Sequence, residues 1–294
     1  MASYISNCLS YLRIPFLASS VLATLISLGL YFKQNELIYP RSIPLNARTE
    51  IPKPSQFGIQ DFEELTIPTS DGESLNAFLI RPSNKQIARN VTFLMFHGNA
   101  GNIGHRVPIA KVLESSVGVN VLMLEYRGYG SSTGTPNEKG LSIDAQAGID
   151  YIRQRTELQK TKIVIYGQSL GGAVGIDLAA RNQHQGDLAA LILENTFLNI
   201  RKLIPSALPP ARFLAPFCHQ IWPSEETIPQ LKIPILFLSG LQDEIVPPSH
   251  MKQLYDACKA PVKVWKALPQ GDHNNTVAEP GYFQFIEEFI RKYV

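Results

Sequence analysis

Cysteine is scarce in this chain of 294 residues. Its three cysteines are Cys8, Cys218 and Cys258, and none of them forms a Cys-x-x-Cys pair. The sequence therefore indicates neither a zinc site nor a framework of disulfides. For Cys218 and Cys258 we expect two buried free thiols, and a single bridge between them is the alternative.

Charge is also scarce. Charged residues make up 18% of the chain, the net charge is +2, and no basic cluster is interleaved with aromatic residues. These features argue against a nucleic-acid partner. There is no internal repeat or low-complexity tract, and the hydrophobic content of 45% supports a folded core. The length fits one domain of about 240 residues with an N-terminal appendage.

One long apolar run lies near the N-terminus. Residues 14–32 carry no charge, and as a helix they would span roughly 28 Å, close to the thickness of a bilayer core. We expect an uncleaved single-pass transmembrane anchor here, preceded by a tail (1–13) and followed by a linker (33–60). A cleaved signal peptide and a buried helix are the alternatives, but no small-x-small cleavage site follows the run.

The orientation of this anchor stays open. Arg13 is the only basic residue before the run, and four basic residues follow it before the folded domain: Lys33, Arg41, Arg48 and Lys53. By the positive-inside rule this distribution places the C-terminal domain in the cytosol. Two Asn-x-Thr tripeptides, which begin at Asn90 and Asn274, are glycosylation acceptors and favour the other side.

Residues 61–294 alternate between expected strands and helices. Residues 63–69 and 75–81 alternate in polarity around Asp71-Gly72, which predicts a hairpin. We then expect strands over 92–97, 119–125, 162–166, 188–193, 235–239 and 262–267, and helices over 143–153, 170–181, 249–258 and 282–293. The pattern predicts an α/β fold with a mostly parallel central sheet covered by helices on both faces.

The most informative segment is residues 162–175. A β-branched run leads into Gly-Gln-Ser-Leu-Gly at residues 167–171, and small and apolar residues at helical spacing follow. This strand–turn–helix context is typical of a nucleophile elbow, whose tight turn has little room for side chains beside the serine. We therefore predict that Ser169 is a nucleophile, which requires a base and an orienting acid.

A suitable acid and base follow in chain order. Asp243 comes after the expected strand 235–239, and His273 lies in a Gly- and Asn-rich loop before the last helix. We predict that His273 takes the Ser169 proton and that Asp243 fixes the tautomer of the imidazole.

Other polar residues compete for these two roles. Glu194, at the end of an expected strand, is the alternative acid. His250 lies at an expected helix start, which disfavours an imidazolium. We interpret Asp272 as a turn former.

A second Gly-x-Ser-x-Gly lies at residues 130–134. Pro136 follows it where an elbow needs a helix, so we interpret Ser132 as a loop residue. The glycines of residues 98–104 lack the helix-opening context of a dinucleotide site. We expect neither a cofactor nor a metal.

The loop at residues 97–102 is the expected oxyanion site. An apolar strand breaks here into His-Gly-Asn-Ala-Gly-Asn. We predict that the backbone amides of Asn99 and Leu170 bind the oxyanion, and we interpret His97 as shaping the loop.

Residues 197–232 interrupt the alternation. They contain six prolines, and three large aromatic residues are spread among them: Phe213, Phe217 and Trp222. We expect a short cap over the site that offers an apolar wall to an acyl group. A structural excursion that only packs on the core is the alternative.

These motifs, together with residues 126–132 and 271–274, resemble those of the α/β-hydrolase family. Within it the chain is similar to the fungal bud-emergence (BEM) homologue group, whose animal relative is α/β-hydrolase domain-containing protein 13. The likeness covers essentially residues 15–294. It implies a type II membrane-anchored serine hydrolase at the endoplasmic reticulum or plasma membrane.

Relatives in this group are linked to the removal of acyl thioesters from proteins. The resemblance and the motifs together predict a hydrolase of ester or thioester bonds in an acylated protein or lipid substrate, with protein depalmitoylation as its specific form. A membrane-tethered scaffold in cell polarity is the alternative from another class. A peptidase of similar fold is a third reading, for which the sequence shows no clamp for a substrate terminus.

Overall fold

Eight strands form one sheet in the spatial order β1-β2-β4-β3-β5-β6-β7-β8. The computed structural model describes residues 2–294, with side chains from residue 15 onward. The strands are β1 (Phe62–Pro68), β2 (Ser74–Ile80), β3 (Val91–Phe96), β4 (Asn120–Leu124), β5 (Lys162–Gln168), β6 (Leu188–Glu194), β7 (Ile235–Gly240) and β8 (Lys263–Leu268). Of the seven pairs in this sheet, β1–β2 and β2–β4 are antiparallel and the others parallel. The mostly parallel sheet with an antiparallel start is therefore confirmed.

Helices cover both faces of this sheet. One face packs against α3 (Glu138–Gln154), α4 (Leu170–Asn182) and α7 (Pro248–Ala257). The other packs against α2 (Val107–Val112) and α8 (Tyr282–Tyr293). The strands are apolar on both sides, since in β3 Leu94 faces the first layer and Phe93 the second. This is the composition expected of a sheet buried on both faces.

The helix before β5 begins earlier than the sequence suggests. We expected it over residues 143–153, whereas α3 begins at Glu138. The side chain of Asn137 accepts a hydrogen bond from the amide of Gly140 and caps the helix. The first turn is polar and contains a glycine, so a search for apolar periodicity misses it.

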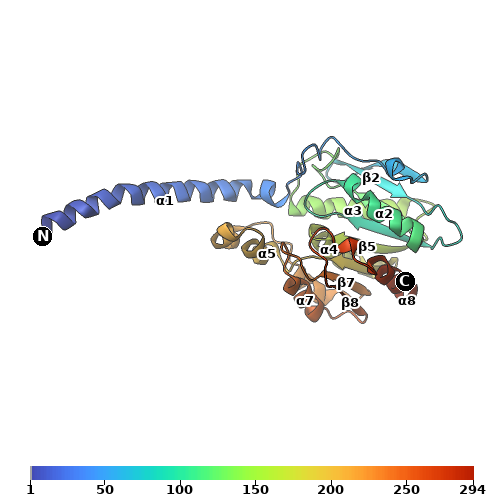
Figure 1. The fold of residues 1–294 in the computed structure, drawn as a ribbon. Coiled ribbons are helices and arrows are strands. Elements are labelled where there is room, and N and C mark those ends of the chain that lie inside the picture. The colour runs from blue at the N-terminus through green and yellow to red at the C-terminus, as the bar shows by residue number, and fades with distance from the viewer. Residues whose placement is uncertain (1) are drawn as a thin grey trace.

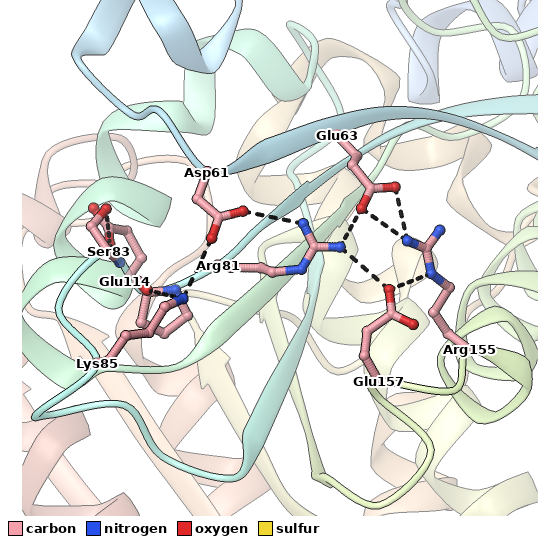
Figure 2. A network of polar contacts seen from close by, with 9 residues as sticks. Asp61, Glu63, Arg81, Ser83, Lys85, Glu114, Arg155 and Glu157 are labelled. Atoms are coloured by element: carbon pink, nitrogen blue, oxygen red, sulfur yellow. Dashed lines mark hydrogen bonds and ion pairs between the residues drawn. The ribbon is translucent and has the colours of Figure 1, made fainter.

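A network of ion pairs ties the β1–β2 hairpin to the loop after α3 (Figure 2). Arg81 contacts Glu63 and lies 3.3 Å from both Asp61 and Glu157. Arg155 donates to the two carboxylate oxygens of Glu63 at 2.8 and 2.9 Å. This loop precedes β5, so the network lies at the amino ends of the parallel strands. It stabilises the hairpin there, away from the carboxyl ends of these strands.

A long helix, α1 (Ala2–Ile38), projects from the domain (Figure 1). Its stretch Pro15–Ile38 has a mean hydropathy of 1.7 and is long and apolar enough to cross a membrane. The helix continues six residues beyond the expected end of the apolar span at residue 32. The segment we expected to be a linker is also packed, since Tyr39, Ala47 and Ile59 are each only 1% exposed. Single buried side chains between prolines form no periodic apolar pattern. The sequence therefore does not predict that residues 33–60 pack against the domain.

The insertion between β6 and β7 is helical. It contains α5 (Ile200–Ala207), the 3-10 helix η5 (Pro209–Phe217), the short α6 (Ser224–Thr227) and η6 (Ile228–Gln230). Cys218 and Cys258 are buried free thiols, as expected. Tyr39 bonds to this insertion, because its hydroxyl donates to Gln220 at 2.9 Å and accepts from Trp222 Nε1 at 3.0 Å. The start of the domain and the insertion are therefore joined.

Candidate active site

Ser169 occupies the turn between β5 and α4. Its φ of 53° and ψ of −117° lie in a region that residues with a Cβ rarely adopt. The amide of Ser169 donates to the carbonyl of Glu194 at 2.8 Å, and its carbonyl accepts from the Thr196 hydroxyl at 2.7 Å. Neighbouring backbone thus holds the strained turn in place. Strain of this kind is concentrated at functional sites.

The glycines around the turn are required by close backbone packing. A Cβ on Gly167 would overlap the carbonyl oxygen of Gly171, and a Cβ on Gly171 would overlap that of Phe96. A Cβ on Gly98 would lie 3.8 Å from the Cβ of Ser169. The elbow and the loop after β3 are therefore in direct contact.

His273 and Asp243 form a buried pair. Nδ1 of His273 lies 2.7 Å from Oδ2 of Asp243, and the carboxylate side chain is only 1% exposed. The other oxygen of Asp243 accepts from the amides of Ile245 at 2.9 Å and Val246 at 2.8 Å. A carboxylate fixed by two amides can hold one tautomer of the ring, with its proton on Nδ1.

The histidine loop has its own support. Oδ1 of Asp272 accepts from the amides of Asn274 at 2.9 Å and Asn275 at 2.7 Å. Hydrogen bonds from Asn275 lower the pKa of Asp272, so this carboxylate stays ionised. It orders the loop that carries His273.

Ser169 and His273 line the same pocket. Within residues 15–294, no hydrogen bond joins the Ser169 hydroxyl to the imidazole. Catalytic hydrogen bonds in unliganded enzymes are often long and shorten when substrate binds. The fold thus brings Ser169 and His273 to one cavity, but the serine hydroxyl and the imidazole are not hydrogen-bonded to each other.

Two backbone amides beside Ser169 are free to receive an oxyanion. Leu170 is the first residue of α4, so its amide has no partner within the helix. In the described part of the chain, neither this amide nor that of Asn99 donates a hydrogen bond to another group. The carbonyl of Asn99 accepts from the Tyr129 hydroxyl at 2.7 Å, and its side chain donates to the carbonyl of Ile38 at 3.2 Å. These bonds fix the peptide groups around the free amide.

His97 lies beneath this loop. Its Nδ1 donates to the carbonyl of Gly98 at 2.7 Å, and its Nε2 lies 3.0 Å from the fully buried carboxylate of Glu125. The ring packs against Tyr126 with the centroids 4.4 Å apart. His97 therefore supports the loop from behind.

Glu194, the alternative acid, is engaged elsewhere. It accepts hydrogen bonds from the hydroxyls of Tyr166 and Tyr282 and from Nε2 of Gln168 at 3.2 Å. Burial raises its pKa, which favours the protonated form. His273 donates to Asp243 and not to this group.

The other rival residues also have structural partners. The Ser132 hydroxyl accepts from the amide of Asn76 at 2.9 Å and donates to the carbonyl of Glu125 at 3.2 Å, and this residue is fully buried. His250 accepts from the amide of Leu198 at 3.4 Å, and burial lowers its pKa. Neither side chain lines the pocket at Ser169.

The pocket has a volume of about 800 Å³ and three kinds of wall. The serine elbow, the Asn99 loop and the His273 loop form one end. The insertion contributes apolar side chains from α5, from η5 and from Leu208 between them, among them Leu203, Ile204, Leu214 and Phe217. The third wall is α1, which contributes Ala23, Thr24, Ser27, Leu28, Leu30, Tyr31, Gln34, Leu37 and Ile38.

The part that α1 plays was missed at the sequence level. Gln34 accepts a hydrogen bond from the amide of His219 at 2.8 Å, so α1 is tied to the insertion. A signal was present: Thr24, Ser27, Tyr31 and Gln34 recur at helical spacing within an apolar run. A polar stripe of this kind in a membrane helix faces protein or a cavity more often than lipid.

A protein-family model and several solved structures are similar to this chain and agree with its fold. The protein-family model Hydrolase_4, described as "Serine aminopeptidase, S33", matches residues 88–227. The α/β hydrolase of Vibrio vulnificus superposes with a TM-score of 0.72 at 20% identity, covering 87% of this chain and 92% of that one. The Pyrococcus furiosus esterase Pf2001 superposes with a TM-score of 0.65 at 18% identity, covering 83% and 95%. The "Alpha/beta hydrolase domain-containing protein WAV2" of Arabidopsis thaliana is 36% identical over 88% of this chain and 88% of its own length, so the chain belongs to the α/β-hydrolase family.

Its relatives define the group more narrowly. Protein bem46 of Schizosaccharomyces pombe is 43% identical over 99% of this chain and 95% of its own length. The Saccharomyces cerevisiae relative named "Uncharacterized membrane protein YNL320W" is 41% identical over 94% and 95%. The chain is thus a bem46-like α/β-hydrolase, and the expected family is confirmed. The apolar helix and the name of the budding-yeast relative both suggest membrane association.

Proposed function

We propose that this protein is a membrane-anchored serine hydrolase that cleaves ester or thioester bonds of an acylated protein or lipid. For an acylated protein, the finer form of this activity is the removal of palmitoyl groups at the endoplasmic reticulum or plasma membrane. The observation that carries the proposal is one apolar pocket that is lined by both Ser169 and His273, whose ring is hydrogen-bonded to Asp243. Among the side chains of residues 15–294, no Asp or Glu lines this pocket, so these residues offer no acidic clamp for the ammonium of a peptide.

The first chemical step forms an acyl-enzyme. The Ser169 oxygen attacks the carbonyl carbon while Nε2 of His273 takes the hydroxyl proton, and Asp243 stabilises the imidazolium. The carbonyl oxygen becomes an oxyanion, which the amides of Asn99 and Leu170 bind. The tetrahedral intermediate then expels the alcohol or thiol, which receives the proton from His273.

The second step uses water. His273 takes a proton from a water molecule as its oxygen attacks the acyl carbon, and the new intermediate expels the Ser169 oxygen with return of the proton. Products are the free acid and the regenerated serine. Neither step uses a metal or cofactor.

The membrane helix fits this substrate class. We propose that α1 is a single-pass anchor and that its C-terminal half is a wall of the acyl site. An acyl chain that is buried in a bilayer reaches Ser169 by moving along α1 into the groove beside α5, without crossing water. Partitioning of apolar groups out of water favours this path by about 0.8 kcal/mol per methylene.

Labelling by a fluorophosphonate probe tests the nucleophile. The full chain in detergent reacts with the probe at one site, and Ser169→Ala abolishes the reaction without lowering the midpoint of thermal unfolding. Ser132→Ala, at the second Gly-x-Ser-x-Gly, is the matched control and retains labelling. Labelling that persists in Ser169→Ala contradicts the proposal.

A further inference from the structure

Among the described residues, the half-buried side chain of Arg106 forms no hydrogen bond or ion pair. This residue ends the 3-10 helix η2 (Ile103–Arg106) and lines the pocket that contains Ser169. Among residues 15–294, no acceptor bonds to its Nε, although that atom is fully buried. No carboxylate forms an ion pair with its guanidinium in this part of the chain.

Other sheltered arginines in this protein are paired. Arg127 donates to Asp71 at 2.8 and 3.0 Å and to Asp144 at 2.8 Å. Arg153 donates to Asp187 at 2.6 and 2.9 Å. Arg106 is only partly buried, and a partly buried cation without protein acceptors is left to water or to a ligand in the pocket. Arg106 therefore differs from these arginines, and a ligand in the pocket could supply the acceptor that it lacks.

The position of Arg106 relates it to the reaction. A Cβ on Gly98 would lie 3.9 Å from a terminal nitrogen of Arg106 and 3.8 Å from the Cβ of Ser169. The guanidinium and the nucleophile thus flank the same glycine of the oxyanion loop. A group bound by Arg106 would be separated from the reacting carbonyl by only a few bonds.

The positive charge of Arg106 in this pocket favours an anionic ligand. Arg106 is a cation, and none of the Asp and Glu side chains that the structure describes lines the pocket. The walls formed by α1, α5 and η5 are mostly apolar, so they accept the acyl chain but no ionic group. An anion on the substrate must then belong to the leaving group. A guanidinium binds a phosphate or carboxylate through two parallel hydrogen bonds.

We infer that Arg106 binds an anionic group on the leaving-group side of the substrate, and that this substrate is an acyl glycerophosphate whose phosphate meets the guanidinium while its acyl chain lies along α1. The inference rests on the proposed serine hydrolase activity. A lipid is favoured over an acylated protein because the pocket is walled by the apolar helix and because Arg106 and Ser169 flank the same glycine, which leaves room for only a short link between the ester and the anion.

Paired substrates test this assignment. The full chain in mixed detergent micelles is given 1-palmitoylglycerol or 1-palmitoylglycerol 3-phosphate, and kcat/KM is measured for each. We expect the wild-type chain to prefer the phosphate at least tenfold. In Arg106→Gln the ratio of the two kcat/KM values falls about 10- to 100-fold, the range for a lost charge-assisted hydrogen bond, and mainly through KM.

Arg291→Gln is the matched control. It removes the same charge from an exposed position on α8, and it leaves the ratio unchanged. If Arg106→Gln leaves the ratio unchanged, Arg106 does not bind the phosphate and the inference is overturned. The same holds if an S-palmitoyl peptide with acidic neighbours is preferred to both lipids.

Competition separates a lipid phosphate from a free anion. Monododecyl phosphate is expected to slow fluorophosphonate labelling of the wild-type chain at least tenfold, but not of Arg106→Gln. Equal protection by inorganic phosphate would show a free-anion site and contradict the inference. Labelling at Ser169 without preference for the phosphate lipid overturns only this inference, whereas absence of labelling overturns the proposed function itself.

Discussion

At the residue scale, the proposed proton transfer depends on how firmly Asp243, the proposed acid, is held. One oxygen of Asp243 accepts from the amides of Ile245 and Val246, and the other faces His273. The carboxylate therefore has no freedom to rotate away from the ring. The orientation of the imidazole follows from backbone geometry in the loop after β7.

Asp243→Asn tests this role. The amide can still accept from the two backbone groups, so the fold is retained, but its NH2 group faces Nδ1 and selects the wrong tautomer. We expect kcat on a p-nitrophenyl ester to fall about 10³- to 10⁴-fold. Glu244→Gln, at the exposed neighbour, changes kcat less than twofold. A loss of activity in Glu244→Gln with activity kept in Asp243→Asn would show that the wrong acid has been identified.

At the scale of elements, the elbow is a contact between three backbones. β5 turns into α4 so tightly that Gly167 meets Gly171, and Gly171 in turn lies against the end of β3. The same contact brings the Asn99 loop to Ser169. Packing of backbone on backbone thus positions the serine and the oxyanion amides together.

Gly171→Ala breaks this contact. Its Cβ would overlap the carbonyl of Phe96, so strands or helix must move, which costs about 1–3 kcal/mol of stability. We expect a lower midpoint of thermal unfolding and slow fluorophosphonate labelling. Gly29→Ala on α1, where no described atom lies within 4 Å of the added Cβ, changes neither. An unchanged rate of labelling in Gly171→Ala would mean that the elbow does not need this close approach.

The elements that the sequence predicts well are those with local signals. The elbow can be predicted from the sequence because its parts are adjacent in the chain. These parts are the strand before Ser169, the glycines of the turn and the small residues of α4. The start of α3 at Glu138 depends on a single cap by Asn137, and apolar periodicity does not detect it. The docking of residues 39–60 depends on isolated contacts such as Tyr39 with Trp222, which no local pattern encodes.

At the scale of the whole molecule, α1 combines the length and hydropathy of a membrane span with a contact to the pocket of Ser169. It projects from the domain (Figure 1), and its C-terminal half lines the pocket together with α5. The neighbouring helix η5 exposes Phe213 by 74% and Phe217 by 64%. Large exposed aromatic side chains beside a membrane-length helix suit contact with lipid. Length and hydropathy predicted the helix, but they do not indicate that it packs against the insertion and lines the pocket of Ser169.

A bulky side chain on α1 tests whether this helix completes the acyl site. Ser27 lines the pocket, so Ser27→Trp shortens the groove. We expect hydrolysis of a sixteen-carbon ester to fall at least tenfold relative to a four-carbon ester. Ile26→Trp places the same ring on an adjacent residue that is 54% exposed and outside the pocket, and it leaves this ratio unchanged. Equal ratios in both variants would exclude α1 from the acyl site.

The most direct measurement is an experimental structure of the full chain after reaction with a long-chain alkyl fluorophosphonate. We expect phosphorus bonded to Oγ of Ser169, with a phosphoryl oxygen within hydrogen-bonding distance of the amides of Asn99 and Leu170. We also expect His273 to turn to the adduct and the alkyl chain to lie between α1 and α5. An adduct on another residue, or an alkyl chain that leaves the pocket away from α1, would contradict it.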